Sequence, residues 1–545
     1  MEKRFFALLG AAAFAGISAF ACTNFIAGKK ATTDGSVMIT YAADSHTLFG
    51  NLTHTPAAVH KEGAMRKVTE WDTGKPLGEI PQPRETFNVV GNMNEYQVAI
   101  GETTWGGREE LRDTTGNSII DYGSLIQIAL ERSKSAPEAI DVMTSLVAEY
   151  GYASEGESFS IADKNEVWVM DMIGKGAEKG AVWVAVRIPD DAICAHANEP
   201  RIRQVDLKDK KNVRYAKDMI EFARKRGWFS GKDSEFSFAD VYGFHDVATR
   251  RGCDGRAWAF MRRFAPSFDK YYSWVIGESD TPMPLYVVPE RKVSLKDMQE
   301  SMRDHYEGTP LAMTDDIGAG PYHVPYRWRP MEYEVDGKKY CMERATATQQ
   351  TGWSFVSQSR DWLPDAVGGI YWFGTDDTNT CVYMPLYCCL TEVPEQFTVG
   401  SLYDFDMNSN FWMNNWVANQ AYYRYDQMIP DVRKVQNGLE DKYRGSRAES
   451  DSALAPLAEA GFRGEVTTEA NRQAAAIAKE ATDSYRALAE YLLVKFLDGN
   501  VKKQNDDGSF KNNEYGLPAY PNFPGYDKKY YENIVKETGD HFLLK

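Results

Sequence analysis

The first 22 residues constrain this chain more than any other segment. Two basic residues precede an apolar run that ends near Ile17, and Ala19-Phe20-Ala21 then stands directly before Cys22. Charged, apolar and small-residue parts in this order are typical of a secretory signal that is removed from the mature protein. The apolar run is too short for a membrane span. We therefore predict a signal peptide over residues 1–21 and a periplasmic or secreted protein that begins at Cys22.

An N-terminal Cys22 would carry a thiol and a free α-amine on the same residue. The pKa of an α-amine is about 7.7–8.0, so this group can accept the thiol proton near neutral pH. An internal cysteine needs a neighbouring base such as histidine, whereas a terminal one can use its own amine, directly or through one water. The position of Cys22 thus predicts a nucleophile and its base in one residue.

Two other interpretations of Cys22 stay open. The signal could be cut elsewhere, which would leave Cys22 as an ordinary buried or paired cysteine. Alternatively, Cys22 could be acylated, which would block its amine and make the protein a lipid-anchored surface protein. Lipoprotein signals usually carry an aliphatic residue three places before the cysteine and a small residue two places before it. Ala19 and Phe20 stand at those places, so the match is poor.

The residues after Cys22 favour a rigid placement of this residue. Within residues 22–39, two runs of β-prone residues flank the dipeptide Asp34-Gly35. Asp-Gly between such runs predicts a β-hairpin. A hairpin would fix the new N-terminus on a sheet, where a nucleophile is held most precisely.

The segment that starts at Cys22 resembles the opening of the cysteine dipeptidases related to the secernins, within the N-terminal-nucleophile hydrolases. The resemblance continues in chain order through residues 91–104, 160–170, 196–202 and 357–374. It implies a four-layer αββα sandwich and a catalytic cysteine that cleavage exposes. Its most specific parts are the opening and the Trp362-Leu363-Pro364 block.

The resemblance also implies roles for four further residues. We expect Asp44 to accept hydrogen bonds from the α-ammonium of Cys22 or to orient it, and a carboxylate there would raise the pKa of the amine. Asn198 is the first candidate for an oxyanion donor and Asn94, or else Asn92, the second, because a side-chain amide donates without adding charge. Asparagine also occurs in turns for purely structural reasons, so that interpretation stays open.

Position 41 departs from the family pattern. Many relatives carry an arginine three residues before the aspartate, and here Tyr41 stands at that place. Tyrosine supplies no fixed positive charge. We expect Tyr41 to line the substrate site and Arg201 to contribute the positive charge from elsewhere, with Arg262 and Arg263 as alternatives.

Periodicity supports an α+β organisation. Ser135 predicts the cap of a helix, because proline follows at an early helical position and Glu138 stands at the capping-box position. Residues 166–173 and 181–188 predict two paired strands. Apolar residues recur every three or four positions on a helix from about Thr468 to Gly499. Segregated helices and strands favour α+β over a doubly wound sheet. We expect three parts: the signal peptide 1–21, a hydrolase domain 22–430, and a helical C-terminal region 431–545 packed on the body.

Composition excludes several function classes. The net charge is −16 and no basic cluster occurs, which argues against nucleic acid as a partner. No spacing typical of zinc, calcium or phosphate-loop sites stands out, so no metal and no cofactor is expected. The seven cysteines fit one reactive thiol with up to three disulfides, or unpaired buried thiols. The C-terminal helix packs on the body or forms part of a homo-oligomer interface.

The sequence therefore predicts an exported cysteine dipeptidase that acts on dipeptides or short peptides. An acylase that removes a non-peptide acyl group is the alternative within the same fold. A non-catalytic surface lipoprotein anchored at Cys22 is the alternative from another class.

Overall fold

Two antiparallel sheets form the centre of the protein. The computed structural model describes residues 22–544, so the predicted signal peptide 1–21 lies outside the described residues. One sheet has seven strands and the other has eight, and every strand pairing within them is antiparallel. In spatial order the seven-stranded sheet contains β16 (Tyr286–Val287), β14 (Ile193–His196), β1 (Asn24–Ala27), β2 (Val37–Asp44), β19 (Thr351–Ser359), β20 (Gly369–Thr375) and β21 (Met384–Tyr387). The eight-stranded sheet contains β15 (Val213–Tyr215), β13 (Glu178–Ile188), β12 (Val167–Lys175), β11 (Gly156–Ala162), β10 (Ala99–Trp105), β9 (Met93–Asn94), β8 (Val89–Val90) and β3 (His54–Thr55).

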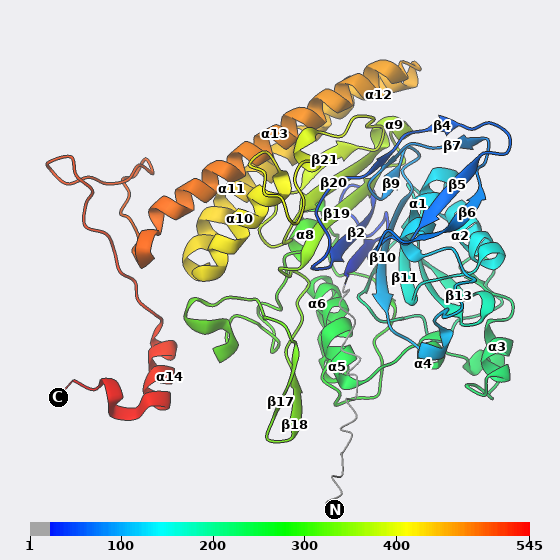
Figure 1. Cartoon of the computed structure of the whole chain (residues 1–545), viewed down its shortest axis with the longest axis horizontal. Coiled ribbons are helices and arrows are strands. Elements are labelled where there is room, and N and C mark those ends of the chain that lie inside the picture. The colour runs from blue at the N-terminus through cyan, green and yellow to red at the C-terminus, as the bar shows by residue number, and fades with distance from the viewer. Residues whose placement is uncertain (1–21, 545) are drawn as a thin grey trace, which may run out of the picture.

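The two sheets pack face to face through β1, β2, β10 and β11. Helices α1 (Tyr122–Arg132) and α2 (Ala136–Tyr150) cover the outer face of the eight-stranded sheet (Figure 1). The outer face of the seven-stranded sheet is covered by helices from several parts of the chain: α6 (Gly255–Phe264), α8 (Leu295–Ser301), α10 (Asn410–Tyr423) and α13 (Arg463–Lys495). This is the four-layer αββα sandwich that the resemblance implied.

Shorter elements connect these layers. Three two-stranded sheets stand apart from the main sheets: β4 (Ala58–Val59) with β7 (Glu85–Thr86), β5 (Met65–Thr69) with β6 (Pro76–Pro81), and β17 (Glu332–Val335) with β18 (Lys338–Cys341). The short helices are α3 (Met219–Lys225), α4 (Phe238–Tyr242), α5 (Val247–Thr249), α7 (Tyr272–Val275) and α9 (Asp365–Gly368).

Local sequence signals explain several of these elements. The Ser135 side chain accepts a hydrogen bond from the Glu138 backbone and so caps α2, which ends at Gly151 with a positive φ. The predicted hairpin at Asp34-Gly35 forms between β1 and β2, with Ile26 opposite Ile39. Both predictions are confirmed.

The C-terminal helices do not form a separate unit. The predicted boundary at residue 430 falls inside α11 (Tyr425–Gly445), and α10 already belongs to the helical layer. The side chain of Asn410 on α10 donates to Thr482 on α13, at 3.0 Å. Helices α11, α12 (Arg447–Glu459) and α13 bury apolar residues in the same core as the seven-stranded sheet. The expected boundary at residue 430 therefore falls within a helix of the common core.

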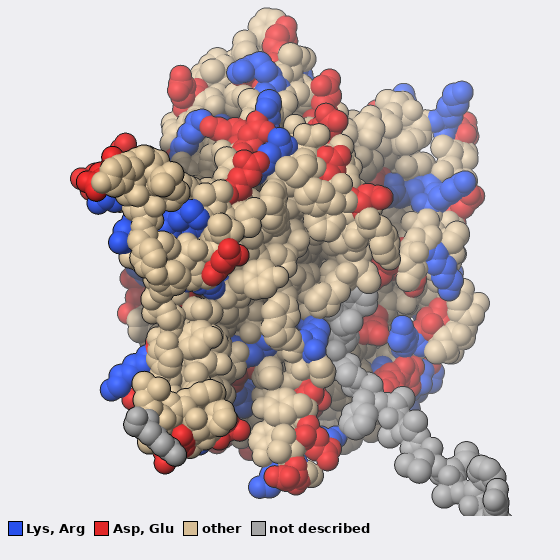
Figure 2. Space-filling view, turned by 60° about the vertical axis from the view of Figure 1, so that its left-hand side comes forward, with Lys and Arg blue, Asp and Glu red and all other residues tan. Residues whose placement is uncertain are grey.

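Beyond α13 the chain runs as an extended tail that ends in α14 (Lys528–Thr538), at the left of Figure 1. No residue of α14 is buried, and its contacts with the body include a hydrogen bond from Lys529 to the backbone oxygen of Asp315. Within residues 22–544, no helix combines the length and the apolar character that crossing a membrane requires. On the face shown in Figure 2, acidic and basic side chains are interspersed around uncharged residues.

All seven cysteines lie in the described part of the chain, and none forms a disulfide. Cys388 and Cys389 are adjacent and both buried, yet each keeps its own thiol. Of the two interpretations of the odd cysteine count, the structure supports unpaired thiols.

Candidate active site

Cys22 stands two residues before β1, in the interior of the sandwich. Its side chain belongs to the core and is 4% exposed. The next residue, Thr23, accepts a hydrogen bond from the Ala42 backbone on β2, at 3.0 Å. The hairpin thereby fixes the thiol beside the last residues of β2, as the sequence predicted.

The thiol of Cys22 faces acidic and neutral groups. Its Sγ atom lies 3.7 Å from the Tyr41 hydroxyl and 3.4 Å from Oε1 of Glu102 on β10. Tyr41 also donates a hydrogen bond to Glu102. Burial, and then the charges of Glu102 and Asp44, raise the pKa of the Cys22 thiol well above its usual value. The raised pKa keeps this thiol protonated at neutral pH.

No histidine contacts this thiol in the part of the chain that the structure describes. His196, on the neighbouring strand β14, shares hydrogen bonds with Thr103 (2.7 Å) and Ser160 (2.7 Å) instead. Burial lowers the pKa of His196 to about 3, so this imidazole is neutral and structural. A histidine-assisted thiol is thus absent from the described site.

Asp44 is the last residue of β2, and it has two opposite effects on the pKa of the Cys22 thiol. Its backbone N–H faces Cys22 and favours the thiolate, whereas its carboxylate charge opposes it. The carboxylate accepts hydrogen bonds from Arg344 (2.8 Å) and Thr351 (2.6 Å). Burial raises the pKa of Asp44 to about 6, although Arg344 and Thr351 act in the opposite direction. The structure brings Asp44 to Cys22, while its partnership with the α-ammonium stays a prediction.

Asn198 reaches the same site through Arg256. The Asn198 amide nitrogen donates to the backbone oxygen of Thr104, at 2.6 Å, and its oxygen accepts from Arg256, at 2.9 Å. One of the two amide hydrogens therefore remains available for an oxyanion. Asn198 also has a positive φ of 57°, a conformation that costs energy in a residue other than glycine.

Arg256 on α6 is the residue that sequence reasoning missed. It is fully buried and donates to the backbone oxygen of Cys22 (2.6 Å), to Thr23 Oγ1 (2.8 Å) and to Asn198. Burial, and then repulsion from Arg344, lower the pKa of Arg256 to about 10, so the guanidinium stays charged at neutral pH. One rigid cation thus ties Cys22 to Asn198, the candidate oxyanion donor.

The arginines proposed from the sequence lie elsewhere. Arg262 and Arg263, on the same helix, pair with Asp269 and Asp304. Arg201 donates to the backbone oxygens of Ala195 and Pro284, both at 2.7 Å, and pairs with Asp254. These contacts join Arg201 to strand β14 and to the segment before β16, and they give no support to a substrate role for Arg201.

Asn94 and Asn92 are also engaged in structural contacts. Both amide hydrogens of Asn94 are used, by the backbone oxygens of Leu130 (2.7 Å) and Ser133 (2.8 Å), so this amide has no hydrogen left for an oxyanion. Asn92 donates to Ile100, at 2.8 Å. The geometry therefore leaves Asn198 as the candidate donor and corrects the expectation for Asn94.

Glu102 and Glu157 were not foreseen either. They lie on adjacent strands, β10 and β11, and are 1% and 0% exposed. A carboxylate inside a strand of small and apolar residues is a sequence signal for a buried functional group, because isolated buried acids are rare. Gly101 permits the close approach of β10 to β1 and β2, since a Cβ atom there would lie 2.7 Å from the Asn24 side chain and 3.1 Å from Tyr41.

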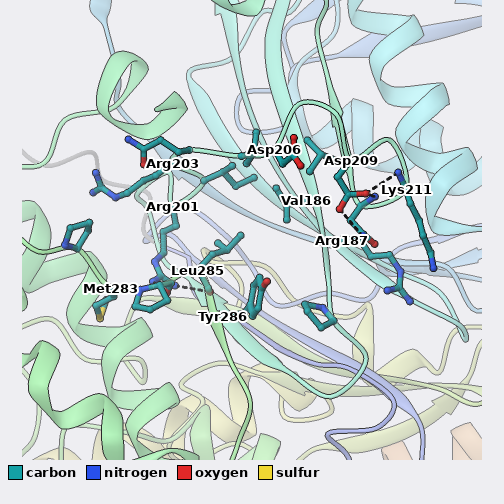
Figure 3. A pocket seen from close by; sticks show the side chains of 18 residues that line it. Val186, Arg187, Arg201, Arg203, Asp206, Asp209, Lys211, Met283, Leu285 and Tyr286 are labelled. Atoms are coloured by element: carbon teal, nitrogen blue, oxygen red, sulfur yellow. Dashed lines mark hydrogen bonds between the residues drawn. The ribbon is translucent and has the colours of Figure 1, made fainter. Parts of the chain in front are cut away.

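A cavity of about 700 Å³ lies next to β14 and β16, and Arg201, Met283, Leu285 and Tyr286 are among its lining residues (Figure 3). The lining includes none of the residues around the thiol. Its arginines Arg187 and Arg203 pair with carboxylates. This cavity is separate from the candidate active site.

The family model described as "Peptidase family C69" matches residues 21–438. A probable dipeptidase of Latilactobacillus sakei is 25% identical over 464 residues, covering 81% of this chain and 89% of that protein. A probable dipeptidase of Salmonella dublin is 26% identical, and the match covers 67% of this chain and 81% of that protein. Dipeptidase A of Lactobacillus helveticus is 24% identical, and the match covers 77% of this chain and 84% of that protein. Among solved structures, penicillin V acylase from Agrobacterium tumefaciens aligns with a TM-score of 0.30 at 12% identity, over 67% of this chain and 86% of that one.

Proposed function

This chain belongs to peptidase family C69 and is a hydrolytic peptidase, and we propose that it is an exported dipeptidase with an N-terminal Cys22 nucleophile. The substrates are dipeptides or short peptides, in line with the names of its relatives. The mature enzyme begins at Cys22 after removal of residues 1–21.

One observation carries the assignment of the nucleophile. Arg256 holds the backbone oxygen of Cys22 and the side-chain oxygen of Asn198 at the same time, while no histidine contacts the thiol within residues 22–544. A buried thiol among carboxylates needs a base of its own to ionise. The free α-amine that processing would create is such a base.

The proposed reaction has two halves. The α-amine takes the thiol proton, and the Cys22 thiolate attacks the scissile carbonyl carbon. Asn198 then donates its remaining amide hydrogen to the developing oxyanion. The α-ammonium returns the proton to the leaving amine, which leaves a thioester on Cys22. Water, deprotonated by the same α-amine, hydrolyses the thioester and releases the acid.

Arg256 acts through its neighbours in this scheme. It fixes Asn198 and the backbone of Cys22, so the oxyanion donor and the sulfur keep one relative position. Asp44 orients the α-ammonium, and its own carboxylate is fixed by Arg344 and Thr351.

The test compares two chains with the same fold. A chain that begins at Cys22 should hydrolyse a panel of dipeptides, and a chain that keeps one uncleaved residue before Cys22 should be inactive. Circular dichroism and thermal denaturation would verify that both are folded. Full activity in the extended chain would contradict the α-amine as base.

A further inference from the structure

A pair of buried carboxyl groups adjoins the thiol and has no basic partner in the scheme above. We propose that Glu102 and Glu157 form a subsite for the free N-terminal ammonium group of the substrate. The enzyme then cleaves the bond after an unblocked first residue and discriminates against N-acylated substrates. This inference rests on the proposed peptidase function and adds the chemical class of its substrate.

Glu102 lies close enough to the sulfur to reach the substrate ammonium group. Oε1 of Glu102 is 3.4 Å from Sγ of Cys22. In an N-terminal residue, the ammonium nitrogen lies about 2.5 Å from its own carbonyl carbon, because two bonds of about 1.5 Å separate them. When the sulfur attacks that carbon, the ammonium group is therefore within reach of Glu102.

Glu157 extends the acidic site away from the thiol. Thr104 donates to Oε1 of Glu157, at 2.9 Å, and lies 3.5 Å from Oε2 of Glu102. The second oxygen of Glu157, Oε2, is buried and accepts no hydrogen bond from a donor in residues 22–544. Leaving a buried carboxylate oxygen without a donor is costly, so a ligand that donates there would be bound tightly.

The electrostatic surroundings of this pair are acidic or neutral. Burial is the main reason that the pKa values of both carboxyl groups are raised, and Glu102 and Asp72 raise that of Glu157 further. Burial, and then the charges of nearby carboxyl groups that include Glu102 and Glu157, raise the pKa values of Tyr122 and Tyr152. Asp44, in contrast, pairs with Arg344. The two carboxyl groups also share a hydrogen bond, which lowers the pKa of Glu102 and raises that of Glu157. The negative charge of the pair therefore falls on Glu102, the group nearer the thiol, and a substrate ammonium group would be its counter-ion.

Tyr41 preserves the negative charge of this subsite. It donates a neutral hydrogen bond to Glu102, which orients the carboxylate without neutralising it. An arginine at position 41 would form an ion pair with Glu102 and occupy the place of a substrate ammonium group. The tyrosine therefore suits a substrate that carries the positive charge itself.

Asp72 adds a more distant negative charge. It lies in the exposed turn between β5 and β6 and accepts a hydrogen bond from Tyr122, at 2.9 Å. Its charge acts on both Glu102 and Glu157. An exposed carboxylate at this place offers a variant that can be tested without disturbing the core.

The experiment compares alanine p-nitroanilide with N-acetyl-alanine p-nitroanilide on the chain that begins at Cys22. The wild-type enzyme should prefer the free amine by at least about 100-fold in kcat/KM. Glu157→Gln should lower kcat/KM for the free amine by roughly 10–100-fold, mainly through KM, since hydrogen bonds to charged groups contribute this much. Its effect on the acetylated substrate should stay within about threefold.

Two controls separate this role from a structural one. Asp171→Asn removes a carboxyl group that is equally buried but binds Ser158 and the backbone of Arg201, so it should change both substrates equally. Asp72→Asn should weaken only the free-amine substrate, by about 2–5-fold, even if Glu157→Gln fails to fold. Equal losses for both substrates in Glu157→Gln and Asp72→Asn would overturn the proposal, and would point to the α-ammonium of Cys22 itself as the partner of the pair.

Binding distinguishes failure of the subsite from failure of the proposed function. Calorimetry with the Cys22→Ala chain and alanyl-alanine, against N-acetyl-alanyl-alanine, needs no turnover. A preference of at least tenfold for the unblocked peptide supports the subsite even if the wild-type protein hydrolyses neither p-nitroanilide. Equal affinities would overturn it, whatever the activity.

Discussion

Replacement of Arg256 by lysine tests how the site is held together. The substitution keeps one positive charge but replaces a rigid fork by a single ammonium group on a flexible chain. Arg256 donates to Cys22 O (2.6 Å), to Thr23 Oγ1 (2.8 Å), to Asn198 Oδ1 (2.9 Å) and to Gly252 O (2.8 Å). A lysine has three donors on one atom and cannot span acceptors on both sides of the site.

The expected loss follows from these contacts. Hydrogen bonds from a charged donor contribute about 1.5–3 kcal/mol each, so losing those to Cys22 and Asn198 removes a few kcal/mol. The part that matters for catalysis is the position of Asn198, because loss of one oxyanion donor costs about 2.7–4 kcal/mol in the barrier. We therefore expect kcat to fall by roughly 10²–10³-fold in Arg256→Lys.

Stability should change less than activity. Burial and repulsion from Arg344 already disfavour the charged form of Arg256, which lowers its pKa to about 10. The native structure therefore gains less from this cation than its hydrogen bonds alone suggest.

The assay is steady-state hydrolysis of alanine p-nitroanilide together with urea denaturation of the same samples. Arg303→Lys is the matched control, because Arg303 is also buried but pairs with Glu300 and Glu440. The control should lose stability and keep kcat within about threefold. A kcat in Arg256→Lys within threefold of wild type would refute the positioning role of Arg256.

Three further changes test other parts of the account. Cys22→Ala should abolish hydrolysis and leave thermal denaturation nearly unchanged; measurable turnover in this variant would rule out Cys22 as the nucleophile. Burial raises the pKa of Asp376 from 3.8 to about 7, so its contribution to stability is complete below about pH 3.8 and is lost as the pH rises through about 7. In Asp376→Asn the fall in melting temperature between about pH 5 and about pH 8 should therefore shrink, and an unchanged fall would contradict this origin. Glu440 accepts hydrogen bonds from Arg303 and from the Tyr383 backbone, so Glu440→Ala should lower the free energy of unfolding by about 3–5 kcal/mol. A loss below about 1 kcal/mol in urea denaturation would show that α11 is not tied to the core through this pair.

The elements that could be predicted from the sequence are those that interactions between residues close together in the chain determine. The hairpin at Asp34-Gly35 and the capped helix after Ser135 follow from turn and capping chemistry within a few residues. The fold itself followed from resemblance, since the order of strands in a sheet depends on pairings between distant segments. Strand β19, for example, pairs with β2 across more than 300 residues.

The candidate site was predicted only in part, for the same reason. Cys22, Tyr41 and Asp44 lie on one hairpin, so their proximity could be read from the chain. Arg256 and Glu102 reach Cys22 from α6 and β10, and no local pattern connects those elements. The one usable signal was a charged residue inside a strand with a buried pattern.

For Asn94, the sequence predicted a catalytic role that the structure does not support. Its segment matched the family pattern, yet the asparagine uses its amide to join β9 to the end of α1. A side-chain amide serves turns and catalysis equally well, so residue type alone could not separate the two roles.

The most direct test of the account is the intact mass and N-terminal residue of the active enzyme purified from its own cells. We predict a chain of 524 residues, 545 minus the 21 removed, that begins with Cys22 and carries a free α-amine. An active enzyme that retains Ala21, or whose Cys22 amine is acylated, would contradict the central claim that the N-terminal cysteine is both nucleophile and base.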